Sequence, residues 1–142
     1  MSQISQYMTQ DHRACDERFA SAEEAVSTQD WESAAVQFEG FQQAMERHLG
    51  MEEETLFPEF EQATGNTMGP TQMMRMEHEQ MRDLIRQLAA ALHAQDVDTY
   101  LGVSETLLIM MQQHNVKEEQ ILYPMTDQAL GGTDVLDRMQ QR

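Results

Sequence analysis

An internal repeat with a period of 66 residues constrains the fold more strongly than any other feature of the sequence. Aligned without a gap, residues 7–67 and 73–133 are identical at 16 of 61 positions. The matched stretches include MERHLGMEEETLFP in the first copy and MQQHNVKEEQILYP in the second. The chain therefore contains two copies of one structural unit, which are expected to adopt the same fold.

Each copy has the pattern of a helical hairpin, because its apolar residues recur every three or four positions. The composition agrees, since the sequence is rich in the helix formers Ala, Glu, Gln, Leu and Met. We predict an all-α fold with helices over about 3–27, 31–62, 71–94 and 97–127. Asp30 and Asp96 are the expected N-caps, and Pro58 and Pro124 are expected to kink or end their helices.

Length and charge limit the classes of protein to be considered. A chain of 142 residues fits one domain, so we expect residues 1–142 to form a single domain with a short polar tail or helix over 131–142. The formal net charge of -16 and the single lysine argue against nucleic acid or an anionic membrane surface as partners. The sequence has no apolar run of about 18 residues and no signal peptide, and its one cysteine, Cys15, fits a reducing compartment, so we expect a cytoplasmic location.

Four of the five histidines fall into pairs that the repeat matches. Residues four apart project from nearly the same side of a helix, so His48 and Glu52 are expected to project together. His12 lies about 16 residues before the turn of its hairpin and His48 about 18 residues after it, which places the two imidazoles at one height. The repeat predicts the same arrangement in the second hairpin. The resulting layer contains His12, His48, Glu52, His78, His114 and Glu118.

Such a layer is typical of a metal site. Buried Glu and His side chains are costly unless they are paired or ligated, and two bridging carboxylates can hold two cations. Imidazole and carboxylate ligands suit iron, manganese or zinc, and iron fits best where oxygen ligands bridge two metals and coordination positions stay open. Duplication alone could have kept these residues, but it does not explain why all six reach one level. We predict two iron ions with an oxo or hydroxo bridge, with zinc occupancy as an alternative and the assignment of each histidine to one metal left open.

Two methionines are candidates for lining a ligand pocket. Met8 and Met74 are matched by the repeat, and each lies one helical turn before a ligand histidine. Most of the other methionines are expected to fill the core, since Met adapts to irregular gaps between helices. His93 has no matched partner and lies near a helix end, so we do not expect it to bind metal.

Two further matched pairs are expected to play structural roles only. Glu53 and Glu119 follow the two ligand glutamates directly, and one residue along a helix turns the side chain by about 100°. They are therefore predicted to be surface charges. Phe57 and Tyr123 share one repeat position and are predicted to pack at the end of the bundle.

The combination of these motifs resembles the hemerythrin HHE cation-binding family. HxxxE is followed by E and then by LFP or LYP, this occurs twice, and a lone His stands on each preceding helix. The resemblance covers residues from about 7 to 127 and implies an up-down-up-down four-helix bundle with a non-haem di-iron pair held by the six residues above. The sequence departs from the oxygen-carrying members, since Met74 stands where they have a further His and the fourth helix carries HxxxE.

The resemblance implies that the irons bind a small ligand such as O₂, NO or peroxide, in sensing or in the response to oxidative or nitrosative stress. The sequence shows no nucleophile elbow, no phosphate-binding loop and no second cofactor motif, so we favour binding over catalysis and assign no catalytic residue. The alternatives are a di-iron enzyme that decomposes hydrogen peroxide or reduces NO, and a protein of iron storage or delivery. The sequence does not identify a protein partner.

Overall fold

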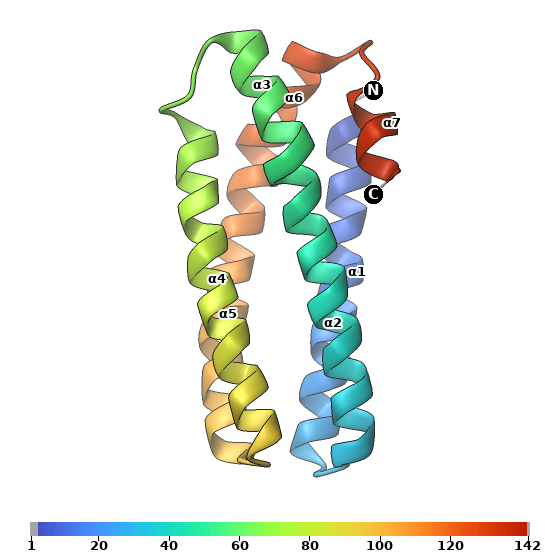
Figure 1. The fold of residues 1–142 in the computed structure, drawn as a ribbon, viewed down its shortest axis with the longest axis vertical. Helices are drawn as coiled ribbons and strands as arrows, with labels where there is room; N and C mark the ends of the chain where they lie inside the picture. Colours follow the sequence, from blue (N-terminus) through green and yellow to red (C-terminus); the bar gives the residue numbers. More distant parts are fainter. Residues whose placement is uncertain (1–2, 142) are drawn as a thin grey trace.

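The computed structural model describes residues 3–141, and every regular element in this range is helical. Four long helices run along the long axis of the molecule (Figure 1): α1 (Gln3–Ser27), α2 (Trp31–Met51), α4 (Pro70–His93) and α5 (Val97–Lys117). Helix α2 continues through a π-helical turn, η1 (Glu52–Leu56), into α3 (Phe57–Thr64), and α5 continues through η2 (Glu118–Leu122) into α6 (Tyr123–Leu130). A short helix, α7 (Val135–Gln140), follows. The predicted all-α class is confirmed.

The two hairpins have nearly identical turns. Helix α1 packs along α2 and α4 along α5, and the two turns lie at the same end of the molecule (Figure 1). Gln29 and Gln95 have positive φ angles of 59° and 53°, and the backbone bonds around them form a Schellman motif. The carboxylates of Asp30 and Asp96 then accept from the backbone amide three residues further on. The two predicted N-caps are therefore confirmed.

The π-helical turns lie where the sequence predicts a disturbance by proline. In each turn a backbone N–H donates to the carbonyl of a glutamate five residues earlier, from Phe57 to Glu52 and from Tyr123 to Glu118. The next residue is proline, which has no N–H, and its ring would collide with the carbonyl four residues earlier in a regular α-helix. A wider turn avoids this collision, so the helix continues past each proline rather than ending there.

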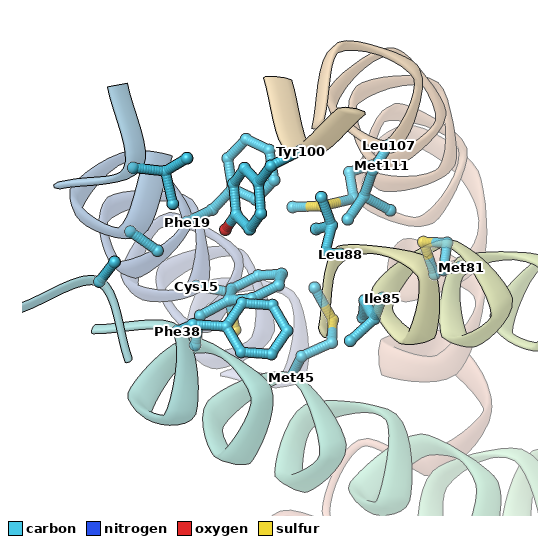
Figure 2. Packing of buried hydrophobic residues seen from close by; sticks show 14 of the residues in the cluster. Cys15, Phe19, Phe38, Met45, Met81, Ile85, Leu88, Tyr100, Leu107 and Met111 are labelled. Carbon is cyan, nitrogen blue, oxygen red and sulfur yellow. The ribbon is translucent and has the colours of Figure 1, made fainter. Parts of the chain in front are cut away.

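Two apolar clusters fill the interior, one toward the hairpin turns and one toward the other end. In the first, side chains from all four long helices interdigitate, and Figure 2 shows Phe38, Tyr100 and Met111 among them. The second cluster includes Met8, Met74 and residues of α3, α6 and α7. Val135 and Met139 of α7 are buried in it, so the segment after residue 131 forms a packed helix as far as the structure describes it. None of the described helices is long and apolar enough to cross a membrane.

Candidate metal centre

The structure brings the six predicted ligand residues together in one buried layer between the two apolar clusters. All six are at most 4 % exposed. Their donor atoms form two groups in which every atom lies within 4.8 Å of the others. One group contains Glu52, His78, His114 and Glu118, and the other contains His12, His48 and Glu118. Because Glu118 belongs to both groups, the layer is continuous and could hold two neighbouring ions.

The helical spacing in each hairpin positions these groups. His and Glu four residues apart project together at the end of α2 and of α5, as predicted, while the lone histidines of α1 and α4 reach across to the other hairpin. The distances from Nε2 to a carboxylate oxygen are 3.7 Å for His48–Glu52, 3.3 Å for His114–Glu118, 3.0 Å for His12–Glu118 and 3.1 Å for His78–Glu52. Each carboxylate therefore faces histidines of both hairpins.

A second carboxylate binds the outer nitrogen of each histidine. The Nδ1–oxygen distances are 2.7 Å for His12–Glu119, 2.7 Å for His48–Asp11, 2.7 Å for His78–Glu53 and 2.8 Å for His114–Glu77. In the neutral imidazole, which is the form that binds a metal, a carboxylate at Nδ1 accepts the proton and Nε2 presents a lone pair to the interior of the layer. This is the arrangement in which histidine ligands of a metal are oriented by an outer carboxylate.

The prediction that Glu53 and Glu119 are surface charges is therefore wrong. Their side chains do turn away from the bundle axis, but toward the neighbouring helix, where each meets a histidine of the other hairpin. Arg82 also binds Glu53, at 2.9 Å, so that His78 and Arg82 outweigh the effect of burial and lower the pKa of Glu53 to about 2. The repeat carries a signal for this role, because both halves conserve an acidic residue directly after the ligand glutamate.

Tyr123 and Phe57 pack in the apolar cluster away from the turns, as predicted, but the hydroxyl of Tyr123 also reaches into the layer, which was not predicted from the sequence. Its hydroxyl donates to Glu52 Oε2 at 2.7 Å and lies 3.0 Å from Glu118 Oε1. It is 3.1 Å from Nε2 of His12 and 3.4 Å from Nε2 of His48. In a regular α-helix Tyr123 would project about 140° from Glu118, but the π-helical turn brings residue i+5 over residue i.

The electrostatics of the layer favour positive charge at its centre. Burial lowers the pKa of His12 and His78, but the neighbouring carboxylates outweigh it and raise both values to about 9. Burial and the charge of Glu118 raise the pKa of Glu52, which is fully buried. Burial and the same two carboxylates raise the pKa of Tyr123 well above its ordinary value. The layer thus concentrates negative charge and hydrogen-bond acceptors in the interior. Only bound protons or metal cations can neutralise that charge.

Several of these buried acceptors have no hydrogen-bond partner. They are Glu52 Oε1, Glu118 Oε2 and the Nε2 atoms of His78 and His114. His78 Nε2 and Glu52 Oε1 lie 3.1 Å apart but make no hydrogen bond, as expected for two lone pairs that face one another. Unpartnered buried polar atoms are costly, and a cation between them removes that cost. The donor set of imidazole nitrogen and carboxylate oxygen therefore fits a first-row transition metal.

A small apolar cavity of about 10 Å³ adjoins three of the histidines, on the side of the hairpin turns. It is lined by His12, Cys15, Met45, His48, Leu49, Met81, Met111, His114 and Asn115. This volume is close to the minimum that admits one water molecule. Met8 and Met74 lie in the apolar cluster on the other side of the layer, so their predicted role as pocket lining stays a prediction. His93 is exposed at the end of α4.

Comparison with protein families gives one match, which agrees with this geometry. The model of the hemerythrin HHE cation binding domain matches residues 3–126, nearly the whole chain. Comparisons with curated proteins and with solved structures gave no match. The matched range contains all six predicted ligands and the four outer carboxylates.

Proposed function

The chain belongs to the hemerythrin HHE cation-binding family, and from this premise we propose that it is a non-haem di-iron protein that binds a small ligand such as O₂, NO or peroxide. Its role would lie in sensing or in the response to oxidative or nitrosative stress. One iron would be held by His12 and His48 and the other by His78 and His114, with Glu52 and Glu118 between them. The two groups of donor atoms that share Glu118 support this division.

The unpartnered acceptors in the buried interior carry the proposal. Four Nε2 atoms face two carboxylates, and four of these buried atoms, namely Glu52 Oε1, Glu118 Oε2 and the Nε2 atoms of His78 and His114, have no hydrogen-bond partner. A layer of this kind destabilises the fold unless cations occupy it. Bound iron would supply Lewis acidity and redox chemistry, while the chain orients the ligands and excludes water.

The up-down-up-down order of the bundle and its single domain are part of this proposal. Two observations support them. The two helices of each hairpin pack along one another. The layer takes residues from both hairpins, so neither hairpin could form it alone. Two of the outer histidine–carboxylate pairs also join one hairpin to the other, as expected if both hairpins belong to one domain.

The burial of the site supports a small ligand. The donor atoms are in a closed interior, and the adjoining cavity of about 10 Å³ is close to the minimum that admits one water molecule. Met45, Met81 and Met111 line it, and methionine side chains adapt easily to a guest of two or three atoms. A larger organic substrate would need a much wider opening.

Metal content and the visible spectrum test the proposal directly. The protein is purified without chelators, reconstituted with ferrous iron without oxygen and then oxidised in air. We expect about two irons per chain, as in di-iron carboxylate bundles, and new absorption bands after azide or NO is added. Glu52→Ala should lose iron, whereas Glu105→Ala, which removes an exposed carboxylate of α5, should not. A reconstituted chain without iron would contradict the proposal.

The same preparation separates binding from the alternative functions. Sustained release of O₂ from hydrogen peroxide, or sustained consumption of NO, that scales with iron content would identify an enzyme. Iron that a chelator removes within seconds would instead favour storage or delivery. Stable iron with reversible spectral changes and no turnover supports the role proposed above.

A further inference from the structure

The six candidate ligand residues are identical in the two halves of the repeat, but the aromatic residue beside them is not. Phe57 and Tyr123 correspond to each other, and each follows the same π-helical turn. The Phe57 ring stacks on His78 with a centroid distance of 5.7 Å, and the Tyr123 ring stacks on His12 at 5.5 Å. The two rings therefore occupy equivalent places, and the only chemical difference between them is the hydroxyl of Tyr123.

This hydroxyl lies at the spacing of a metal ligand. Ligand atoms about 2.1 Å from an octahedral ion lie about 3.0 Å from their nearest neighbours in the same shell. The Tyr123 oxygen lies 2.7, 3.0, 3.1 and 3.4 Å from the donor atoms of Glu52, Glu118, His12 and His48. It is thus a near neighbour of four candidate ligand atoms at once.

A purely structural role explains this position less well. A buried tyrosine hydroxyl commonly needs one hydrogen-bond partner, and one carboxylate oxygen would be sufficient. Here it also faces the Nε2 lone pairs of His12 and His48, whose Nδ1 protons are directed to Glu119 and Asp11. One hydroxyl proton serves only one acceptor well, and His12 Nε2 and Glu118 Oε1 also lie 3.0 Å from each other, so the phenol oxygen belongs to a cluster of candidate donor atoms rather than to one hydrogen-bonded pair. A cation among these atoms satisfies all of them together with the phenol oxygen.

We propose that Tyr123 is a ligand of the metal held by His12 and His48, and that it makes the two metal positions of the centre chemically different. The inference rests on the proposed function, since it requires that iron occupies the layer. When the oxygen–iron bond forms, the hydroxyl proton is released to solvent and a phenolate remains. The other position, beside His78 and His114, has no such ligand, because Phe57 carries no oxygen.

Phenolate bound to ferric iron has a spectroscopic signature that other residues of this layer cannot produce. It gives a charge-transfer band in the visible, and excitation in that band enhances the ring vibrations of the phenolate in a Raman spectrum. We expect both in the air-oxidised, iron-loaded chain. Tyr123→Phe should lose both while it keeps its iron, since six other ligands remain. Tyr100→Phe, which removes another buried tyrosine hydroxyl in the cluster near the turns, should keep both.

A gain of signal tests the same idea independently of any loss of folding. Phe57→Tyr places a second phenol at the equivalent position, and in the Tyr123→Phe background it should restore the band. A natural chain that holds iron but shows no phenolate vibrations would overturn the inference and leave the proposed function intact, as would phenolate vibrations that survive in Tyr123→Phe. A chain that takes up no iron would overturn both.

Discussion

At the scale of single residues, the outer carboxylates determine what the histidines can do. A free imidazole exchanges its proton between two nitrogens and rotates about its side-chain bonds. Here the four carboxylates fix the proton on Nδ1 and the orientation of each ring, with distances of 2.7 to 2.8 Å. The lone pairs are thereby directed inward before a metal binds. The conformational entropy of the histidine side chains is therefore lost when the chain folds and not when a metal binds.

Loss of one outer carboxylate should therefore weaken metal binding without removing a ligand. Glu119→Ala frees the Nδ1 of His12, and we expect the affinity for iron to fall about 10- to 100-fold, as is usual for such outer partners. Competition with a coloured chelator measures this affinity. Glu105→Ala serves as the control, because it removes an exposed carboxylate of α5. Equal affinities in the two variants would show that Glu119 does not orient His12.

At the scale of helices and turns, the sequence predicts what is periodic and misses what interrupts the period. The predicted helix at 3–27 agrees with α1, and the other three begin within one residue of the observed starts. The common level of the six ligand side chains followed from counting along regular helices. Each π-helical turn inserts one residue into that count, so every later side chain rotates. For this reason, counting along a regular helix does not place the Tyr123 hydroxyl in the layer. Only the proline that follows Tyr123 indicates that the helix is irregular there.

The outer carboxylates could not be derived in the same way. The helical period gives the direction in which Glu53 and Glu119 project from their helices. It does not give the residues that they contact. That depends on how the two hairpins pack, which a single sequence does not state. The matched acidic residues before His12 and His78 and after Glu52 and Glu118 are consistent with such a role, but they are equally consistent with a charged surface.

The hairpin turns contain a removable backbone strain. Gln29 and Gln95 adopt a left-handed conformation at the end of their helices, where glycine is usual and a residue with a Cβ pays about 1 kcal/mol or more. Gln29→Gly and Gln95→Gly should each stabilise the fold by about 0.5–1 kcal/mol, since the flexibility of glycine in the unfolded chain offsets part of the gain. Thermal unfolding should show a rise of about 2–4 °C for each 1 kcal/mol.

A glycine in a regular part of the same hairpin provides the matched control. Gln37 is exposed in the middle of α2, and Gln37→Gly should destabilise the fold by about 1 kcal/mol. Destabilisation at all three sites would mean that the left-handed conformation of the two turn glutamines is not strained.

At the scale of the whole molecule, the polar layer separates two apolar clusters of different architecture. The cluster toward the turns is closed by two short, capped connections and draws on all four long helices. The other cluster is built from α3, α6 and α7 and from the ends of the long helices; α1 and α4 reach it as unbroken helices, whereas α2 and α5 reach it through η1 and η2. The candidate metal ligands Glu52 and Glu118 lie in these two turns. The centre therefore ties the second cluster to the first.

Removal of iron should for this reason loosen one end of the molecule more than the other. Without cations, the facing carboxylates and lone pairs repel one another or take up protons, and η1 and η2 lose the ions that hold their glutamates in place. We expect amide hydrogen exchange to become faster in residues 52–64 and 118–130 after treatment with a chelator, while residues 81–91 and 100–111 keep their protection. The overall unfolding temperature should also fall, because iron binds the folded state only. Mass spectrometry of peptic fragments measures the exchange in both forms, and the Glu52→Ala variant should resemble the chelated protein even when iron is supplied. Uniform acceleration along the chain would show that the centre stabilises both clusters equally, and no change would show that folding is independent of the metal.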